Sequence, residues 1–158
     1  MLLLILKILI LITLIYIAIQ DFKEREIYLF LVVGLGVLLL IYRLQITYYK
    51  IFLLESLLNL SLIAVLVGTL SIYSKLRLKT NLFKVFGLGD LLFFIAISLG
   101  LATIPFFVLF VFSLVFSLII FLALKKRLRF KTVPLAGLQA VFFFVVFVLD
   151  WCFGIIDF

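Results

Sequence analysis

Long apolar segments alternate with short polar ones along the whole chain, and this alternation predicts the architecture. Six apolar runs can be distinguished, over residues 2–19, 27–42, 51–73, 91–103, 106–124 and 134–149. A helix that crosses a bilayer needs about 20 apolar residues. The runs therefore predict an all-α, polytopic bundle of about six transmembrane helices. The second, fourth and sixth runs are short, and we expect them to extend into flanking polar residues or to thin the bilayer locally.

Two boundaries admit a second interpretation. The fourth and fifth runs are separated only by Ile104 and Pro105, and Gly100 and Pro105 predict a tight hairpin there. The alternative is five spans with one long kinked helix. The first run could be a signal peptide, but it lacks a basic leading segment and an A-x-A-like cleavage site. We therefore expect it to remain as a helix.

Charge distribution predicts the orientation and argues against one class of partner. The chain is 69% hydrophobic and carries a net charge of +7. Its basic residues cluster between apolar runs, as in membrane proteins, so we expect contacts with lipid and none with nucleic acid. Eleven of the 14 Lys and Arg residues follow the first, third and fifth runs. The positive-inside rule then predicts that these three basic segments face the cytoplasm and that both termini lie outside. The length suits one multi-pass domain, residues 1–158, which we expect in the cytoplasmic (inner) membrane.

Few residue types remain for chemistry. The chain has no His and one Cys, which excludes an internal disulfide and a Cys-cluster zinc site, and we expect neither metal nor cofactor. Carboxylates are then the main candidates. Five of the seven acidic residues are expected to be ordinary charges of loops or helix ends, with Glu55 near Lys50; the five are Glu24, Glu26, Glu55, Asp150 and Asp157.

The other two acidic residues, Asp21 and Asp90, lie at the edges of apolar runs. Two runs separate them, so both fall on the same membrane face, where ionisable groups are often functional. Asp90 could be an ordinary helix N-cap. Asp21 closes the first run, where a carboxylate faces the negative end of the helix dipole. Two carboxylates across a low-dielectric gap share a proton and can activate water, and Gly87 and Gly89 would let backbone approach closely.

Three segments resemble motifs of the type IV prepilin peptidases, which are membrane aspartyl proteases. Residues 21–27 resemble the first aspartate motif, which includes Lys23 and Arg25. Residues 87–90 resemble the second, Gly-x-Gly-Asp. Residues 131–137, with Pro134, resemble the segment that opens the last helix of the family. The resemblance spans nearly the whole chain, and the three motifs together are more specific than any one of them.

The resemblance implies an aspartic endopeptidase with Asp21 and Asp90 as the catalytic pair. It implies a prepilin-like substrate with a short basic leader, a Gly before the cut and an apolar helix, which serves a type IV pilus or protein secretion. Lys23, Arg25, Gly87, Gly89 and Pro134 would bind substrate or shape the loops. The short chain, without paired cysteines, implies a peptidase without N-methyltransferase activity. From the helix dipoles, Asp90 is expected to be the base and Asp21 the acid.

The chain departs from the family pattern at two places. Tyr28 and Leu29 stand where the family usually has Pro-Asn, and Leu92 stands where it usually has Lys. Because of these departures, an alternative interpretation is a non-catalytic membrane scaffold in which the motifs are inherited but inactive. A transporter that uses the same aspartates for cations or protons is a further alternative, although neither lies near the middle of a run. A presenilin-like protease also uses Gly-x-Gly-Asp, but here Gln20 precedes Asp21 where that class has Tyr. The oligomeric state is not predicted.

Overall fold

The computed structural model describes residues 1–24, 27–79, 87–124 and 134–154. Within these residues the chain is helical and has no strand. The elements are α1 (Leu2–Glu24), α2 (Leu29–Ile46), α3 (Tyr49–Tyr73), the π-helical turn η1 (Ser74–Leu78), α5 (Leu88–Gly100), α6 (Thr103–Leu124) and α7 (Leu135–Phe153). The all-α fold class is confirmed, and each predicted apolar run corresponds to one of the helices α1, α2, α3, α5, α6 and α7.

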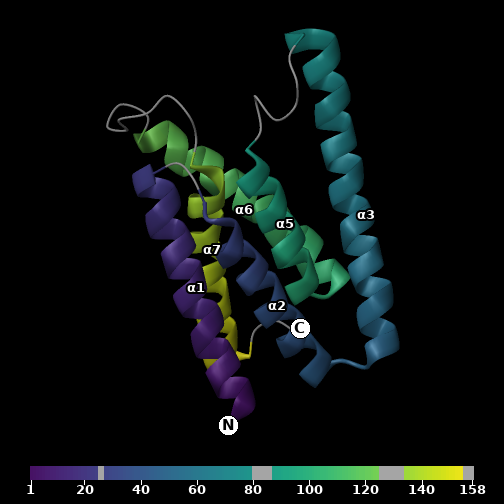
Figure 1. Ribbon diagram of the computed structural model, residues 1–158, viewed down its shortest axis with the longest axis vertical. Coiled ribbons are helices and arrows are strands. Elements are labelled where there is room, and N and C mark those ends of the chain that lie inside the picture. Colours follow the sequence, from purple (N-terminus) through teal and green to yellow (C-terminus); the bar gives the residue numbers. More distant parts are fainter. Residues whose placement is uncertain (25–26, 80–86, 125–133, 155–158) are drawn as a thin grey trace.

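The helices pass back and forth between two ends of a bundle (Figure 1). We call the end at which α1 finishes and α5 and α7 begin the upper end, as it is drawn in Figure 1, and the opposite one the lower end. α7 packs mainly against α1, and α5 mainly against α2. Residues close to the end of the first apolar run and to the starts of the fourth and sixth are therefore brought to the same end.

The turn between α5 and α6 lies a few residues before its predicted position. α5 ends at Gly100 and α6 already begins at Thr103, so Pro105 is inside the first turn of α6. A proline is tolerated there because the N–H that it lacks would have no partner within the helix. The next amide, that of Phe106, donates to the carbonyl of Ala102 at 2.8 Å. The alternative of one long kinked helix is wrong, since α6 returns toward the upper end (Figure 1).

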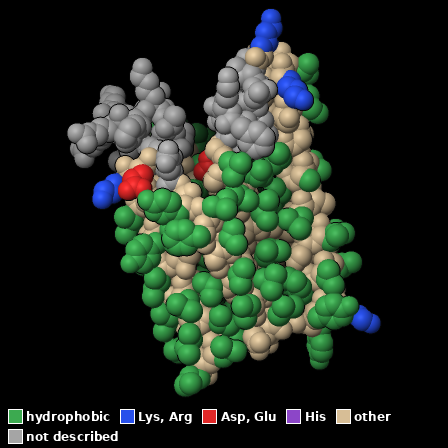
Figure 2. Space-filling model, in the orientation of Figure 1, with side chains coloured by type: hydrophobic (Ala, Val, Ile, Leu, Met, Phe, Trp, Pro, Cys, Tyr) green, Lys and Arg blue, Asp and Glu red, His purple; other side chains and the backbone are tan. Residues whose placement is uncertain are grey.

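The surface of the bundle is that of a membrane protein. Five of the described helices are long and apolar enough to cross a bilayer, whereas the apolar helix α5 is shorter. With 13 residues, α5 is about 20 Å long at 1.5 Å per residue, against about 30 Å for the hydrocarbon core. Hydrophobic side chains cover the flank of the molecule, whereas the charged side chains on the visible face gather at its ends (Figure 2). The flank is therefore suited to contact with lipid.

Polar contacts fasten α3 to the rest of the bundle. The carboxamide Nδ2 of Asn59, which is fully buried, donates to the carbonyls of Ser98 at 2.9 Å and Leu101 at 3.0 Å. These carbonyls belong to the last turn of α5 and the residue after it, where helices leave acceptors unpaired. Nearer the lower end, Arg43 of α2 forms a salt bridge with Glu55 of α3. α3 is thus held by its first half.

Two of the acidic residues expected to be ordinary charges have surroundings that the sequence did not indicate. Glu55 does not simply sit near Lys50 but pairs with Arg43, whose side chain is only 1% exposed. Asp150 lies in the last turn of α7, at a helix end as expected, but it is only 5% exposed. The sequence did not indicate the surroundings of Glu55 and Asp150, because a single charged residue near the end of an apolar run does not show whether a neighbouring helix covers it. Glu24 is exposed as predicted, and Glu26 and Asp157 lie outside the described residues.

Replacing Glu55 by Ala is expected to destabilise the bundle, because Arg43 would stay buried without its partner. Loss of one member of a buried pair costs roughly 3–5 kcal/mol. Because the Glu55 side chain keeps 22% exposure, we expect about 2–3 kcal/mol, seen as a lower midpoint of thermal unfolding in detergent. Glu24→Ala, at an exposed position, is the control. If the double variant Arg43→Met/Glu55→Leu is no more stable than Glu55→Ala, an unpaired buried charge is not the cause.

Candidate active site

Asp21 continues the buried stripe of α1. The core-facing residues of this helix recur at steps of three or four residues, which places them on one side of a helix; they are Leu6, Ile10, Leu14, Ile17 and Asp21. The carboxylate is therefore directed into the bundle, and Asp21 is only 6% exposed. α1 does not end at Asp21, as the apolar run suggested, but continues to Glu24, so Asp21 lies within the last turn.

Asp90 lies in the first turn of α5 but does not cap it. The N-cap is Gly87, and Asp90 is the third residue of the helix, so the N-cap alternative is wrong. Its carboxylate instead accepts a hydrogen bond from the backbone N–H of Gly87, the residue before the helix. Acidic side chains at this third position commonly reach back to the N-cap amide in this way. The contact leaves one side of the Asp90 carboxylate directed at α7.

The first turn of α7 holds both carboxylates. The N–H of Ala136 donates to Oδ1 of Asp90 at 2.9 Å, and the N–H of Gly137 donates to Oδ2 of Asp21 at 2.6 Å. Pro134 is the N-cap residue of this helix. The first amides of a helix have no acceptor within it and carry the positive end of its dipole. Two successive amides of α7 thus bring the two aspartates together, which makes Asp21 and Asp90 one paired site, called the carboxylate pair below.

Close approach to Asp21 requires glycine at position 137. A Cβ atom added to Gly137 would lie 2.8 Å from Oδ2 of Asp21 and 3.0 Å from its Cβ. At Gly89 a Cβ atom would meet Ile27 at 3.3 Å, so this glycine packs closely against the start of the second apolar run. Gly87 and Gly89 were predicted from the sequence to allow such approaches. The involvement of Ala136 and Gly137 was not predicted.

Opposing effects act on the charge of the carboxylate pair. Burial and the proximity of Asp21 disfavour ionisation of Asp90, while the amides of Ala136 and Gly87 favour it. Asp21 likewise accepts the amide of Gly137. The helix dipoles do not distinguish an acid from a base within the pair, because Asp21 is near the C-terminus of α1 but also faces the N-terminus of α7. Carboxyl groups held this close to each other generally titrate as a unit.

Of the two basic residues predicted for the site, the structure describes only Lys23. Lys23, two residues beyond Asp21, is exposed and lines a cavity between α1 and α7. Arg25 lies outside the described residues. Tyr28, where the prepilin peptidases usually have Pro, is exposed, and its N–H donates to Oε1 of Gln20 at 3.3 Å. Leu92, the other departure, is partly buried and packs against the hydrophobic core.

The family model described as the type IV leader peptidase family matches residues 8–124, more than half of the chain. The chain belongs to this family. The predicted resemblance to this family is thereby confirmed over the first two motifs, whereas residues 131–137 lie beyond the match. The activity that the family implies is that of a leader peptidase.

The match of the type IV leader peptidase family includes Asp21 and Asp90 but ends at residue 124, before α7. The helix whose first amides hold both carboxylates therefore lies beyond it. A comparison with curated proteins and with solved structures found no match.

Proposed function

We propose that this type IV leader peptidase is an aspartic endopeptidase in which Asp21 and Asp90 act together on one water molecule. The observation that supports this is the convergence of two carboxylates, from α1 and α5, on successive amides of α7. Aspartic proteases place two carboxyl groups close together so that they share one proton. The resemblance of residues 21–27 and 87–90 to the aspartate motifs supports the same assignment.

The chemistry needs one ionised and one protonated carboxyl group. The ionised group removes a proton from water as the water oxygen bonds to the carbonyl carbon of the scissile amide. The protonated group donates a hydrogen bond to the carbonyl oxygen, on which negative charge develops. The C–N bond then breaks, and the leaving nitrogen takes up the proton that came from the water. Because Asp21 and Asp90 face the same helix terminus, we assign these roles to the pair and leave the assignment of each carboxyl group open.

The proposed substrate is a prepilin-like membrane precursor with a short basic leader, a Gly before the cut and an apolar helix after it. The resemblance supports this class, and the apolar flank of the bundle suits a substrate anchored in lipid. At the upper end, Lys23 lies in the last turn of α1, and Lys75, Arg77 and Lys79 follow α3. By the positive-inside rule this end faces the cytoplasm, so cleavage would occur at the cytoplasmic face of the inner membrane, without subsequent methylation.

A designed precursor tests the proposal. It has a leader of about six residues with several Lys, one Gly, and then about 20 apolar residues, enough for one span. Purified protein in lipid vesicles is expected to shorten this precursor by the length of the leader, which mass spectrometry would detect. A precursor with Gly replaced by Val is the control. If neither precursor is cut while the protein is folded, the scaffold and transporter alternatives are favoured instead.

A further inference from the structure

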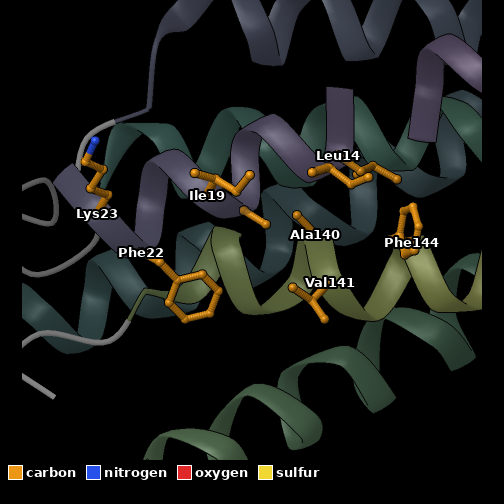
Figure 3. Close-up of a pocket in the computed structure, with 9 residues that line it drawn as sticks. Leu14, Ile19, Phe22, Lys23, Ala140, Val141 and Phe144 are labelled. Atoms are coloured by element: carbon orange, nitrogen blue, oxygen red, sulfur yellow. The ribbon is translucent and has the colours of Figure 1, made fainter. Parts of the chain in front are cut away.

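A cavity of about 550 Å³ lies between α1 and α7. α1 contributes Leu14, Ile15, Ala18, Ile19, Phe22 and Lys23 to its lining, and α7 contributes Ala140, Val141 and Phe144. Lys23 lies at one end of the cavity, while Leu14 and Phe144 lie toward the other (Figure 3). The residues from 14 to 23 cover about 14 Å of helix at 1.5 Å per residue. Apart from Lys23, the lining is apolar.

On α7 the lining of the cavity begins one helical turn below Gly137, whereas on α1 it extends past Asp21 to Lys23. Ala18 precedes Asp21 by three residues, and Ala140 follows Gly137 by three. Residues three or four apart on a helix lie on the same face. The hydrogen bond between Gly137 and Asp21 therefore lies on the same seam between α1 and α7 as the cavity.

The cavity opens to the flank of the bundle. Ile19 and Phe22 are 57% and 38% exposed, although both line it. Because this flank suits lipid, an occupant can enter sideways from the membrane. The volume is within the range of about 300–1,000 Å³ that holds a drug-sized molecule, so it accommodates a few side chains and not a whole helix.

We propose that this cavity receives apolar side chains from the substrate helix that follows the scissile bond. The inference rests on the proposed function. In the proposed substrate the scissile bond directly precedes an apolar helix. When this bond lies at Asp21 and Asp90, the first turns of the helix must therefore lie beside the pair. The cavity is the apolar surface at that place. Side chains from one face of the substrate helix, spaced by three or four residues, enter the cavity while the helix lies along the seam.

The positive charge of Lys23 determines which part of the substrate, the leader or the helix after the scissile bond, enters the cavity. Lys23 lies at the upper end of the cavity, so a basic leader is repelled from it and remains in the aqueous phase. The apolar part after the cut meets no such barrier. An acyl chain of a lipid also fits an apolar cavity, but it has no group that would interact with the neighbouring pair of carboxylates. We therefore assign the cavity to the substrate helix.

The chain offers a matched pair of variants for the test. Ile19 lines the cavity, whereas Ile119 of α6 does not. Their exposed fractions are 57% and 59%, and each lies five residues before the end of a helix that runs to the upper end. Trp at position 19 obstructs the cavity without disturbing the buried core. Trp at position 119 makes the same chemical change on a different part of the flank.

Both variants are assayed on the designed precursor and on a short peptide that ends about four residues after the Gly, too short for a span. Ile19→Trp is expected to raise KM for the long precursor about ten-fold, as when one apolar side chain loses its contacts. It is expected to leave cleavage of the short peptide unchanged, and Ile119→Trp is expected to change neither. An equal effect of Ile19→Trp on both substrates, or no effect on either, would overturn the assignment. If the native protein cuts neither substrate, the proposed function itself fails.

Cross-linking provides a second readout. The chain has one Cys, at position 152, which Ser would replace. Cys at position 19 or 119 is then combined with Cys in the first turns of the precursor helix, in the Asp90→Asn background so that the precursor remains uncut. A disulfide at position 19 and none at position 119 supports the proposal. Equal yields at both positions, or none at position 19, would contradict it.

Discussion

Replacement of Asp21 or Asp90 by Asn is expected to abolish cleavage of the designed precursor, with a fall of about 10³-fold or more in kcat. Asn has nearly the shape of Asp but can neither accept a proton from water nor share one across the pair. Each variant can still accept the α7 amide through its carboxamide oxygen, so the fold is expected to be retained. Initial rates in vesicles, measured by mass spectrometry of the released leader, would provide the comparison.

Glu24→Gln is the matched control for these variants. Glu24 lies in the same last turn of α1 as Asp21, but its side chain is exposed. It loses a carboxylate at the same end of the molecule, so a general effect of charge on precursor binding would appear in it as well. Unchanged cleavage by Glu24→Gln together with inactive Asp21→Asn and Asp90→Asn variants supports the dyad. Residual rates above a tenth of the native rate in either Asn variant would show that its carboxylate is not required.

Most of the fold could be predicted because each apolar run is long enough to indicate its own helix. The boundaries were less predictable, since lipid-facing helices continue into polar residues: α1 extends beyond Asp21 to Glu24, and α7 continues to Phe153. The start of α6 was missed for a different reason. Pro105 was interpreted as a break, whereas a proline in the first turn is compatible with a helix. The local sequence indicates that a helix begins nearby but does not determine the residue at which it begins.

The site was predictable in its carboxylates but not in the groups that hold them. Asp21 and Asp90 could be assigned to one end of the bundle by counting runs. The amides of Ala136 and Gly137 are 46 and 116 residues away from their acceptors, and backbone groups leave no signature in side-chain patterns. Gly137 in the first turn of a helix, after Pro134, was the available signal. The burial of Arg43 and Asp150 likewise depends on neighbouring helices.

Gly137→Ala is expected to impair cleavage by about 10²-fold, because a displacement of about 1 Å at a reacting group can cost that much. The new methyl group would lie 2.8 Å from Oδ2 of Asp21. Either α7 moves away or the Asp21 side chain turns, and both changes lengthen the hydrogen bond that now measures 2.6 Å. The effect should appear mainly in kcat, since Gly137 does not line the cavity proposed for the substrate helix.

Gly34→Ala is the matched control for this substitution. Gly34 is also a helical glycine, but a Cβ atom there would meet nothing within 4 Å. Alanine favours a helix over glycine by about 1 kcal/mol, so both variants gain the same intrinsic preference. Gly34→Ala should therefore retain native cleavage and be at least as stable as the native protein. Full activity of Gly137→Ala would mean that the contact between α7 and Asp21 is not needed for catalysis. Loss of activity in both variants would indicate a general requirement for helix flexibility instead.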